Sequence, residues 1–332
     1  MGCVAKHSWS KSLTTLRGLH ISTERDEEIL RQLNRLLKHD DEGSLIAEPM
    51  RFTGNLETRG IALIEGSGSG KTTAVDRVLS THPALKPTSA GDPPKFLRIQ
   101  VPSPATLKSL GREVLKATGL VDVSPRASAW EIWGVVRHRL ALLGIVVLWF
   151  DEAHDMFLSG SAREIDDMLK MLKSLMQNES AVIPILSGTQ RLAEITRFDE
   201  QVNRRLTKVV PKPLCQGVDE EPLYRMIEEY CAEVGLKPEL DDTLALRLIH
   251  ASRHRFGRAI ETITNAIESA LEEGARVLTW EHFATAWGMQ EGCDWEQNVF
   301  AATDWAAIEL DTDAENFEAE RTKRQTRQVG RR

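Results

Sequence analysis

The sequence predicts an α/β protein, in which a doubly wound parallel sheet is followed by a small helical domain. Three observations support this prediction. Short apolar runs alternate with segments of helical periodicity as far as about residue 215, which is typical of strands joined by helical crossovers. Two of these runs lead directly into polar or glycine-rich segments. From Asp219 onward the sequence contains no strand-like run, and short helical segments are joined by polar turns.

The individual elements follow from the spacing of apolar residues. In 24–38 they recur at 30, 33, 36 and 37, with Thr23 as an N-cap, and a charged connector is expected between this helix and the first strand. We expect strands at 61–64, 96–101, 145–150, 181–186 and 206–210. We expect helices at 24–38, 74–80, 104–118, 127–143 and 161–176, and then at 220–234, 241–252, 257–273 and 279–287.

The composition is that of a soluble globular protein. Of 332 residues, 41% are hydrophobic and 27% are charged. No run of 18 apolar residues is present, and the first ten residues lack the apolar core of a secretory signal. The cysteines at 3, 215, 231 and 293 share no metal-ligand spacing, so we expect reduced thiols and a cytoplasmic protein.

Charge is distributed unevenly along the chain, whose net charge is −7. Ten carboxylates and no basic residue lie between Glu291 and Glu320, whereas the last twelve residues carry six basic side chains and no acid. The body is therefore nearly neutral. Two interpretations of the C-terminal end remain open, a solvated, partly disordered tail and a tail that binds phosphates or a protein partner.

A phosphate-binding loop is predicted directly after the first strand of the sheet. The glycines of this segment let successive backbone N–H groups point at a phosphate, and the helix that follows adds its dipole. Lys71 would reach the β- and γ-phosphates of ATP, and the Thr72 hydroxyl would bind Mg²⁺. Glu65 stands where the motif has its first glycine, so Gly66 would ease the turn one residue later. The loop consists of Gly66, Ser67, Gly68, Ser69, Gly70, Lys71, Thr72 and Thr73.

Two carboxylates end the apolar run Ile145–Phe150. Asp151 would belong to the Mg²⁺ site, and Glu152 would polarise the attacking water. Together with the phosphate loop, this pair predicts an Mg²⁺-dependent ATPase whose catalytic residues include Lys71 and Glu152.

Three further positions match the requirements of an ATPase that works as an oligomer. Thr189, at the tip of the strand after Asp151, would sense the γ-phosphate. Arg204 and Arg205 precede the last strand, where an arginine supplied in trans stabilises transition-state charge in a neighbouring subunit. Arg205 is the first candidate and Arg204 the second, and the choice between these two is left open. Arg258, at the start of a helix, would bend back to the nucleotide.

These motifs divide the chain into four predicted parts. They are an N-terminal extension with a helix at 1–50, a nucleotide-binding α/β domain at 51–215, a helical lid domain at 216–290, and the acidic segment and basic tail at 291–332.

The order of the motifs resembles that of the AAA+ superfamily. Within it, the chain is similar to transposition ATPases of the TniB/TnsC type from about residue 20 to 290. The most specific match is the stretch 149–163, which reads Trp-Phe-Asp-Glu-Ala-His-Asp-Met-Phe-Leu-Ser-Gly-Ser-Ala-Arg. The run Ile-Pro-Ile-Leu-Ser-Gly-Thr at 183–189 resembles the family's strand that ends in Gly-Thr.

The resemblance implies that ATP-bound subunits form a ring or a helical filament on double-stranded DNA of any sequence. It implies that they select a transposition target and recruit a DDE transposase of the TniA/TnsB type, with a TniQ-like targeting protein as a further partner. Basic side chains near the inner rim of the sheet would contact DNA. These are Lys108, Arg112, Arg126, Lys170 and Lys173.

Other functions remain open. A different oligomeric AAA+ ATPase, such as a helicase-loader-like or defence ATPase, would carry the same motifs. A nucleotide-gated scaffold would need the loop but not the base Glu152. The string Asp151–His154 also occurs in DEAH helicases, but the chain has no room for their second ATPase-like domain. His154 is either a coupling residue or a structural hydrogen-bonding residue.

Overall fold

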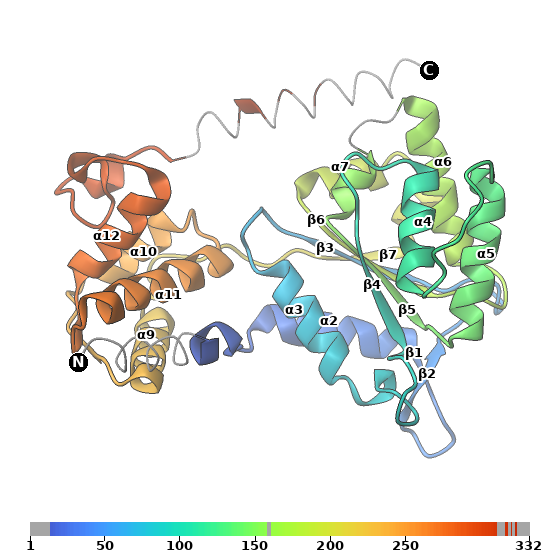
Figure 1. Cartoon of the computed structure of the whole chain (residues 1–332), viewed down its shortest axis with the longest axis horizontal. Coiled ribbons are helices and arrows are strands. Elements are labelled where there is room, and N and C mark those ends of the chain that lie inside the picture. The colour runs from blue at the N-terminus through green and yellow to red at the C-terminus, as the bar shows by residue number, and fades with distance from the viewer. Residues whose placement is uncertain (1–13, 158–160, 311–315, 318–319, 321–322, 324–332) are drawn as a thin grey trace. The chain divides into compact units, whose positions relative to one another are not determined.

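The computed structural model describes residues 14–157, 161–310, 316, 317, 320 and 323 (Figure 1). Residues 158–160 of the family-like stretch, a smaller part of the predicted acidic segment and almost all of the basic tail lie outside these residues. The chain divides into two compact units. The α/β unit contains Ser22–Ser67 and Lys71–Pro211, and the helical unit contains Gly68–Gly70 and the described part of Lys212–Phe317. The boundaries between the four predicted parts remain predictions.

Five strands form one parallel sheet in the order β4-β5-β6-β3-β7. Because β3 comes first in the chain and later strands lie on both of its sides, the sheet is doubly wound, as predicted. Each strand corresponds to one predicted run, with ends shifted by no more than two residues. The strands are β3 (Gly60–Ile64), β4 (Phe96–Gln100), β5 (Val147–Asp151), β6 (Ile183–Gly188) and β7 (Leu206–Val209).

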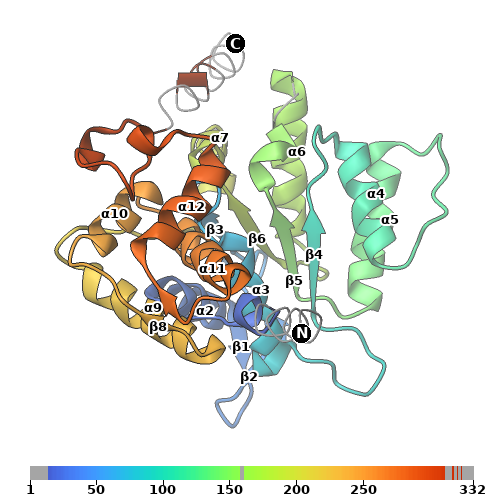
Figure 2. The ribbon, with the colours of Figure 1, turned by 60° about the vertical axis from the view of Figure 1, so that its left-hand side comes forward.

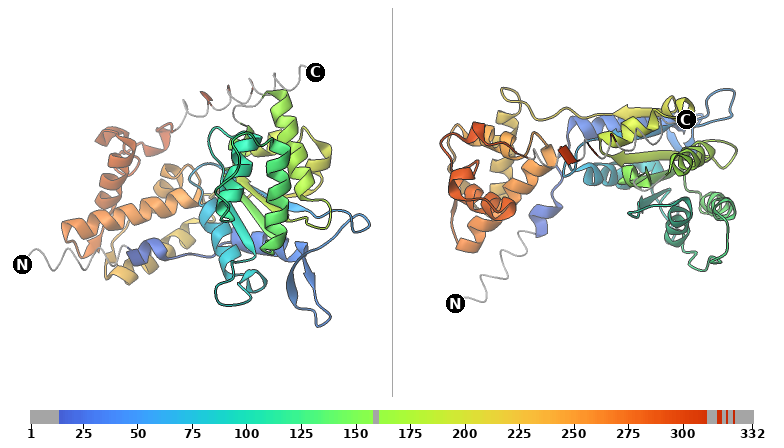
Figure 3. Two further views of the ribbon diagram at one scale, coloured as in Figure 1. Left: turned by 45° about the vertical axis from the view of Figure 1, so that its right-hand side comes forward. Right: turned by 90° about the horizontal axis from the view of Figure 1, so that it is seen from above.

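Helices cover both faces of this sheet (Figure 2, Figure 3). Alternate residues of β3 point to opposite faces, as the two-residue period of a strand requires. Ile61 and Leu63 pack with α2 and α3, whereas Ala62 and Ile64 belong to the core on the other face. The helices are α2 (Glu24–Leu36), α3 (Lys71–Thr81), α4 (Leu107–Ala117), α5 (Ala129–Leu142), α6 (Ala162–Leu175), α7 (Gln190–Thr196) and α8 (Glu200–Asn203).

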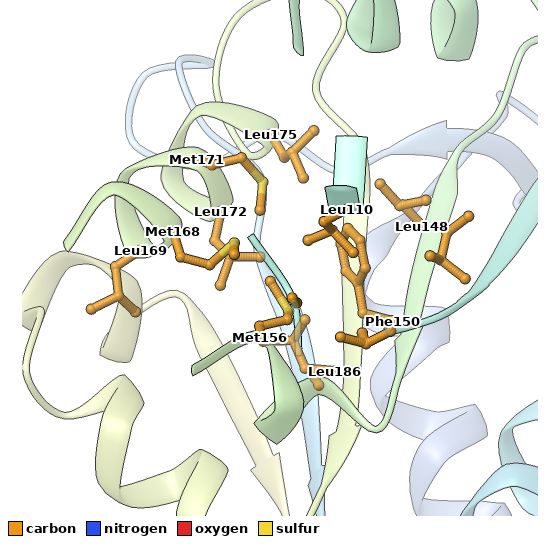
Figure 4. Packing of buried hydrophobic residues seen from close by; sticks show 14 of the residues in the cluster. Leu110, Leu148, Phe150, Met156, Met168, Leu169, Met171, Leu172, Leu175 and Leu186 are labelled. Atoms are coloured by element: carbon orange, nitrogen blue, oxygen red, sulfur yellow. The ribbon is translucent and has the colours of Figure 1, made fainter. Parts of the chain in front are cut away.

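Figure 4 shows the core beneath α4 and α6, where Phe150 and Leu148 of β5 lie close to Leu110 of α4. The apolar face of α6 supplies leucine and methionine side chains to the same cluster. Burying a large apolar side chain stabilises the fold by about 1.5–3 kcal/mol. This layer therefore fixes β5, and with it the position of Asp151 at the end of that strand.

Local capping determines where the helices of this layer begin. The Glu131 N–H donates to Ser128 Oγ, and the Glu131 carboxylate accepts from the Ser128 N–H at 2.7 Å. The same reciprocal pair, between Ser161 and Glu164, starts α6. Each of these reciprocal pairs is a capping box, which satisfies backbone N–H groups that have no partner inside the helix.

One prediction for the N-terminal region is wrong. The predicted helix 24–38 ends at Leu36, and its last two residues and the expected charged connector form an antiparallel hairpin, β1 (Leu37–His39) with β2 (Leu45–Pro49). Leu37 is fully buried beside α2, and Leu45 and Ala47 of β2 pack against the same core, so a few apolar side chains anchor the hairpin within a mostly polar segment.

The helical unit contains four main helices around its own apolar core. The structure adds to the prediction a parallel pair of two-residue strands, β8 (Lys237–Pro238) and β9 (Val277–Leu278). Beyond the last predicted helix, Val299 and Phe300 also pack into this core. Among the residues described, no helix is both long enough and apolar enough to cross a membrane. The main helices are α9 (Glu220–Val234), α10 (Leu244–Ala251), α11 (Phe256–Glu273) and α12 (Trp280–Glu291).

Candidate functional site

The predicted site residues of the α/β unit follow the carboxyl ends of three neighbouring strands. In the order β5-β6-β3, Asp151 ends the first strand, Ser187 and Gly188 end the second, and the phosphate loop follows the third. Ile64 pairs in register with Gly188, so the strand ends lie level. In parallel α/β sheets this edge is where ligands bind.

The phosphate loop has the backbone that its glycines allow. Gly68 and Gly70 have φ angles of 73° and 85°, the left-handed region that side chains disfavour. The loop leads into the N-terminus of α3, which begins at Lys71. Lys71 is buried, and its Nζ donates to the carbonyls of Glu65 at 3.1 Å and Gly66 at 2.8 Å. The lysine is thereby held beneath the loop that it is expected to serve.

Asp151 is the centre of a buried hydrogen-bond network and is 1% exposed. One carboxylate oxygen accepts from Thr72 Oγ1 at 2.9 Å and from the Arg98 guanidinium at 2.8 Å. The other oxygen accepts from Ser187 Oγ at 2.7 Å. A buried carboxylate needs such partners, because a polar group that is buried without hydrogen bonds costs free energy.

Trp149 contacts two of the residues that hold Asp151, namely Ser187 and Arg98. Trp149, on β5, donates its indole N–H to Ser187 Oγ at 2.8 Å. The Arg98 guanidinium lies over the Trp149 ring, 4.7 Å from its centroid. Arg98 and Ser187 were not identified from the sequence. A polar residue at the end of a buried strand, as Ser187 is, was the available signal.

The Thr72–Asp151 pair fits Mg²⁺. A hydroxyl oxygen and a carboxylate oxygen lie 2.9 Å apart beside the phosphate loop, and these are hard oxygen ligands that Mg²⁺ prefers. Mg²⁺ usually takes only one or two protein ligands and completes its shell with phosphate oxygens and water. The residues present therefore suit a metal that arrives with a nucleotide.

Glu152 differs from Asp151 in exposure and in backbone conformation. Its φ is 55°, so the chain turns sharply after β5, and its side chain is 34% exposed. The Glu152 carboxylate lies 3.3 Å from Nδ1 of His154. A partly solvated carboxylate next to a buried one is suited to act on water.

His154 packs against the end of β6 and is mostly buried. Burial lowers its pKa, because the charged ring loses solvation, and Lys71 and Arg191 lower it further. The neighbouring Asp155 and Glu152 carboxylates act in the opposite direction but do not outweigh burial. The ring is therefore neutral near pH 7, and within the part of the chain that the structure describes its buried Nδ1 lies beside Glu152 without forming a hydrogen bond.

Thr189 lies at the N-cap of α7, immediately beyond the end of β6. Its side chain makes no capping hydrogen bond and is half-buried. The hydroxyl thus lies at the same edge of the sheet as Asp151 and the phosphate loop. Its role toward a γ-phosphate remains a prediction.

The two candidate arginines have different surroundings. The Arg205 side chain is 4% exposed and forms a direct ion pair with Glu57. The Arg204 side chain is 54% exposed and lies 3.4 Å from the same carboxylate. No pattern in the sequence singles out Glu57. Its position beside these arginines follows from strand pairing rather than from any local pattern.

Arg258 lies in the first turn of α11 in the helical unit. Within that unit, the Gly257 N–H donates to the carbonyl of Ser69 at 3.1 Å. A Cβ atom on Gly257 would lie 2.4 Å from the Ser69 carbonyl carbon, so only glycine fits there. The predicted contact of Arg258 with a nucleotide is not tested by these observations.

The predicted DNA-binding side chains differ in how they are used. Lys108 and Arg126 are exposed. Arg112 is half-buried and donates to the Ser124 carbonyl at 2.9 Å, which ties α4 to the loop before α5. Lys170 pairs with Asp166 along α6 at 2.7 Å, and Lys173 is half-buried.

The comparisons with known proteins agree with this fold. The profile of the family described as "Bacterial TniB protein" matches residues 17–213. The chain also resembles the Aeropyrum pernix ORC1 protein in complex with DNA, with a TM-score of 0.56 and 17% identity over 83% of this chain and 67% of that one.

Two further solved structures are similar. The ADP form of Aeropyrum pernix ORC2 has a TM-score of 0.54 and 18% identity over 84% of this chain and 72% of that one. Cdc6p from Pyrobaculum aerophilum has a TM-score of 0.53 and 11% identity over 78% of this chain and 65% of that one. At these identities the likeness concerns the fold alone, and the predicted AAA+ fold is confirmed. A search of curated proteins gave no match.

Proposed function

Since the chain belongs to the bacterial TniB family, we propose that it is an Mg²⁺-dependent ATPase that assembles on duplex DNA and regulates the choice of transposition target. The observation that carries this proposal is the meeting of Thr72 and Asp151, 2.9 Å apart, beside the loop that holds Lys71. A chance glycine-rich loop would not be paired with a buried carboxylate from a strand 80 residues further along the chain.

The nucleotide would bind along the phosphate loop. Lys71 would exchange its hydrogen bonds to the Glu65 and Gly66 carbonyls for bonds to the β- and γ-phosphates. The backbone N–H groups at the start of α3 would bind the β-phosphate. The ADP form of the Aeropyrum pernix ORC2 protein is consistent with nucleotide binding by this fold.

Hydrolysis would depend on how the chain orients its two carboxylates. Thr72 and Asp151 would hold Mg²⁺, which when bound neutralises charge on the phosphates. Ser187 and Arg98 keep the Asp151 carboxylate in one orientation. Glu152, which turns away from the strand and reaches solvent, would accept a proton from the attacking water.

Duplex DNA is the proposed assembly platform. The exposed cations Lys108 and Arg126 supply phosphate contacts in each copy, and a ring or filament repeats them many times. Arg112 and Lys170 already contact other residues of the chain, so we assign them a smaller share of the DNA phosphate contacts. The ORC1 structure, which is a complex with DNA, is consistent with this use of the fold.

The proposed partners follow from family membership. They are a DDE transposase of the TniA/TnsB type, a TniQ-like targeting protein and further copies of this chain. ATP would stabilise the DNA-bound assembly, and hydrolysis would release it.

The proposal is tested by measuring DNA binding with and without ATP over a series of salt concentrations. We expect binding to need ATP, to be independent of DNA sequence, and to weaken steeply with salt. Lys71→Ala should abolish ATP binding and DNA assembly together, whereas Lys86→Ala, an exposed lysine of the loop after α3, should change neither.

Two results would argue against the proposal. ATP-independent DNA binding by the Lys71→Ala variant would separate the nucleotide site from assembly. ATP-dependent assembly without measurable hydrolysis would instead favour a nucleotide-gated scaffold. Binding of a DDE transposase by the ATP-bound chain in a pull-down would support a role in transposition, whereas binding of a replicative helicase would support the helicase-loader alternative.

A further inference from the structure

We propose that Glu57 is a positioning residue that gives two adjacent arginines different roles. It fixes Arg205 as a structural residue and orients Arg204 toward the ATP of a second copy of the chain. This inference rests on the proposed function, because it assigns one residue to the site that two ATPase subunits would share.

Strand pairing brings Glu57 to these arginines, which lie 147 and 148 residues later in the chain. Gly60 at the start of β3 pairs with Leu206 at the start of β7, and the Gly60 N–H donates to the Arg205 carbonyl at 2.9 Å. Because the two strands are parallel, the residues that precede them lie together at one end of the sheet.

Glu57 itself is held firmly in place. Its backbone forms bridges with Phe52 and Gln177, and its side chain accepts a hydrogen bond from Thr53 Oγ1 at 2.9 Å. The side chain is 6% exposed. A fixed, buried carboxylate can impose an orientation on cations that contact it, which a mobile surface carboxylate cannot do.

Arg205 cannot leave this carboxylate without a large loss of stability. Both side chains of the pair are buried, so moving the guanidinium away would leave an unpaired charge out of water. Breaking one partner from a buried ion pair costs about 3–5 kcal/mol. Arg205 is therefore unsuited to reach a neighbouring subunit.

Arg204 contacts the same carboxylate from the solvent side. Its Nη2 lies 3.5 Å from one oxygen of Glu57 and 3.4 Å from the other, and just over half of its side chain is exposed. Both contacts involve Nη2 and hold the guanidinium beside a fixed carboxylate, while the side chain as a whole stays largely accessible to solvent. An arginine of this kind is able to bind an anion on another molecule.

The charges of the cluster point to the same assignment. Burial alone would raise the pKa of Glu57, but the Thr53 hydrogen bond and the positive charges of Arg205 and Arg204 lower it overall. Glu57 is thus ionised at neutral pH. One carboxylate facing two guanidinium groups leaves a net charge of about +1, carried at the surface by Arg204. In an ATPase oligomer, the negatively charged triphosphate of ATP bound to a second copy of the chain is the ligand that complements this positive charge.

The test is a subunit-mixing experiment on the full chain. We compare ATP hydrolysis by Arg204→Ala, Glu57→Asp and Glu57→Gln, each alone and mixed with Glu152→Gln subunits, which supply an intact Arg204 but no base. Glu57→Asp retains the charge for Arg205 but is one methylene too short for Arg204. Arg77→Ala, an exposed arginine on α3, is the matched control.

We expect Arg204→Ala to hydrolyse ATP at least about tenfold more slowly while isolated subunits bind ATP as tightly as the wild type. Both Glu57 variants should lose activity in the same way, and mixing with Glu152→Gln should restore hydrolysis in all three cases. Glu57→Gln should also lower the melting temperature, because it leaves the buried Arg205 without its carboxylate, whereas Glu57→Asp keeps that charge. The Arg77→Ala control should match the wild type. Arg205→Ala should instead lower the melting temperature.

Several outcomes would overturn the inference. Full activity of Arg204→Ala would remove its role in trans, and full activity of Glu57→Asp would remove the positioning role. Loss of activity with no recovery on mixing would mean that the variants damage their own site. If the wild type hydrolyses ATP at a rate per subunit that does not change on dilution, it is the proposed oligomeric function that fails.

Discussion

Arg25 of α2 and Glu65 form an ion pair, with 3.2 Å between Nη1 and Oε2. Both side chains are largely buried, and Glu65 occupies the position where phosphate loops have their first glycine. The carboxylate at this unusual position is thus neutralised by a helix that precedes the sheet. This relationship explains how the loop tolerates a negative charge close to where a triphosphate is expected to bind.

Arg25→Met should therefore weaken both the fold and ATP binding. The substitution leaves the Glu65 carboxylate unpaired and buried, which should lower the free energy of unfolding by about 3 kcal/mol. We expect ATP affinity to fall more than ADP affinity, because ATP carries more negative charge. Urea denaturation and titration with both nucleotides measure these effects.

The double variant Arg25→Met, Glu65→Gln provides the control. With the carboxylate removed, most of the loss should be recovered, so the two substitutions should be strongly non-additive. Additive effects would mean that the pair does not act as a unit.

Glu152→Gln should trap ATP-bound assemblies on DNA. Glutamine keeps the size of the side chain but cannot accept the proton from water, so binding should persist while hydrolysis stops. The lifetime of the complex on duplex DNA is the measurement. Glu179→Gln, an exposed residue outside the site, is the control. Rapid turnover by Glu152→Gln would exclude Glu152 as the base.

Ser187→Ala should affect both stability and turnover. The hydroxyl accepts from the Trp149 indole and donates to Asp151, and all three side chains are almost fully buried. Its loss leaves a buried indole N–H without a partner, which should cost about 1–3 kcal/mol. Chemical denaturation and the rate of hydrolysis test this, with the exposed Ser80→Ala as the control. An unchanged rate would mean that the orientation of Asp151 does not depend on Ser187.

Local patterns predicted the parts of the structure that depend on neighbouring residues. Runs such as Ile61–Ile64 gave the strands, and the glycine spacing before Lys71 gave the loop. The Asp-Glu pair after Phe150 gave the end of β5. In these cases the periodicity of side chains and the backbone demands of glycine act over a few residues.

Contacts between segments that lie far apart in the chain could not be predicted from local patterns. Arg204 and Arg205 are adjacent and chemically identical, yet one is exposed and the other is buried against Glu57. That difference depends on the register of β3 with β7, which no local pattern encodes. The Arg25–Glu65 pair spans 40 residues and was hidden for the same reason. Local patterns therefore predicted the candidate site but could not distinguish the surroundings of its two arginines.

A buried histidine connects the end of α3 to α2. His82, just after α3, is 3% exposed, and its Nε2 lies 2.9 Å from the side-chain oxygen of Asn34 on α2. Burial lowers the pKa of His82 from its ordinary value of 6.5. Within the part of the chain that the structure describes, no hydrogen bond reaches Nδ1, so a second proton there would be buried without an acceptor.

The sign of the pH effect follows from this lowered pKa. The unfolded chain binds a proton at His82 more readily than the folded chain, so the contribution of His82 to stability is present above pH 6.5. It is lost as the pH falls from 6.5 through the lower folded value. His82→Gln keeps an N–H donor but does not titrate, so its stability should decline less than that of the wild type between pH 8 and about pH 5. Urea denaturation across this range measures the difference, and parallel pH profiles would show that the attachment of α2 to α3 does not depend on a neutral His82.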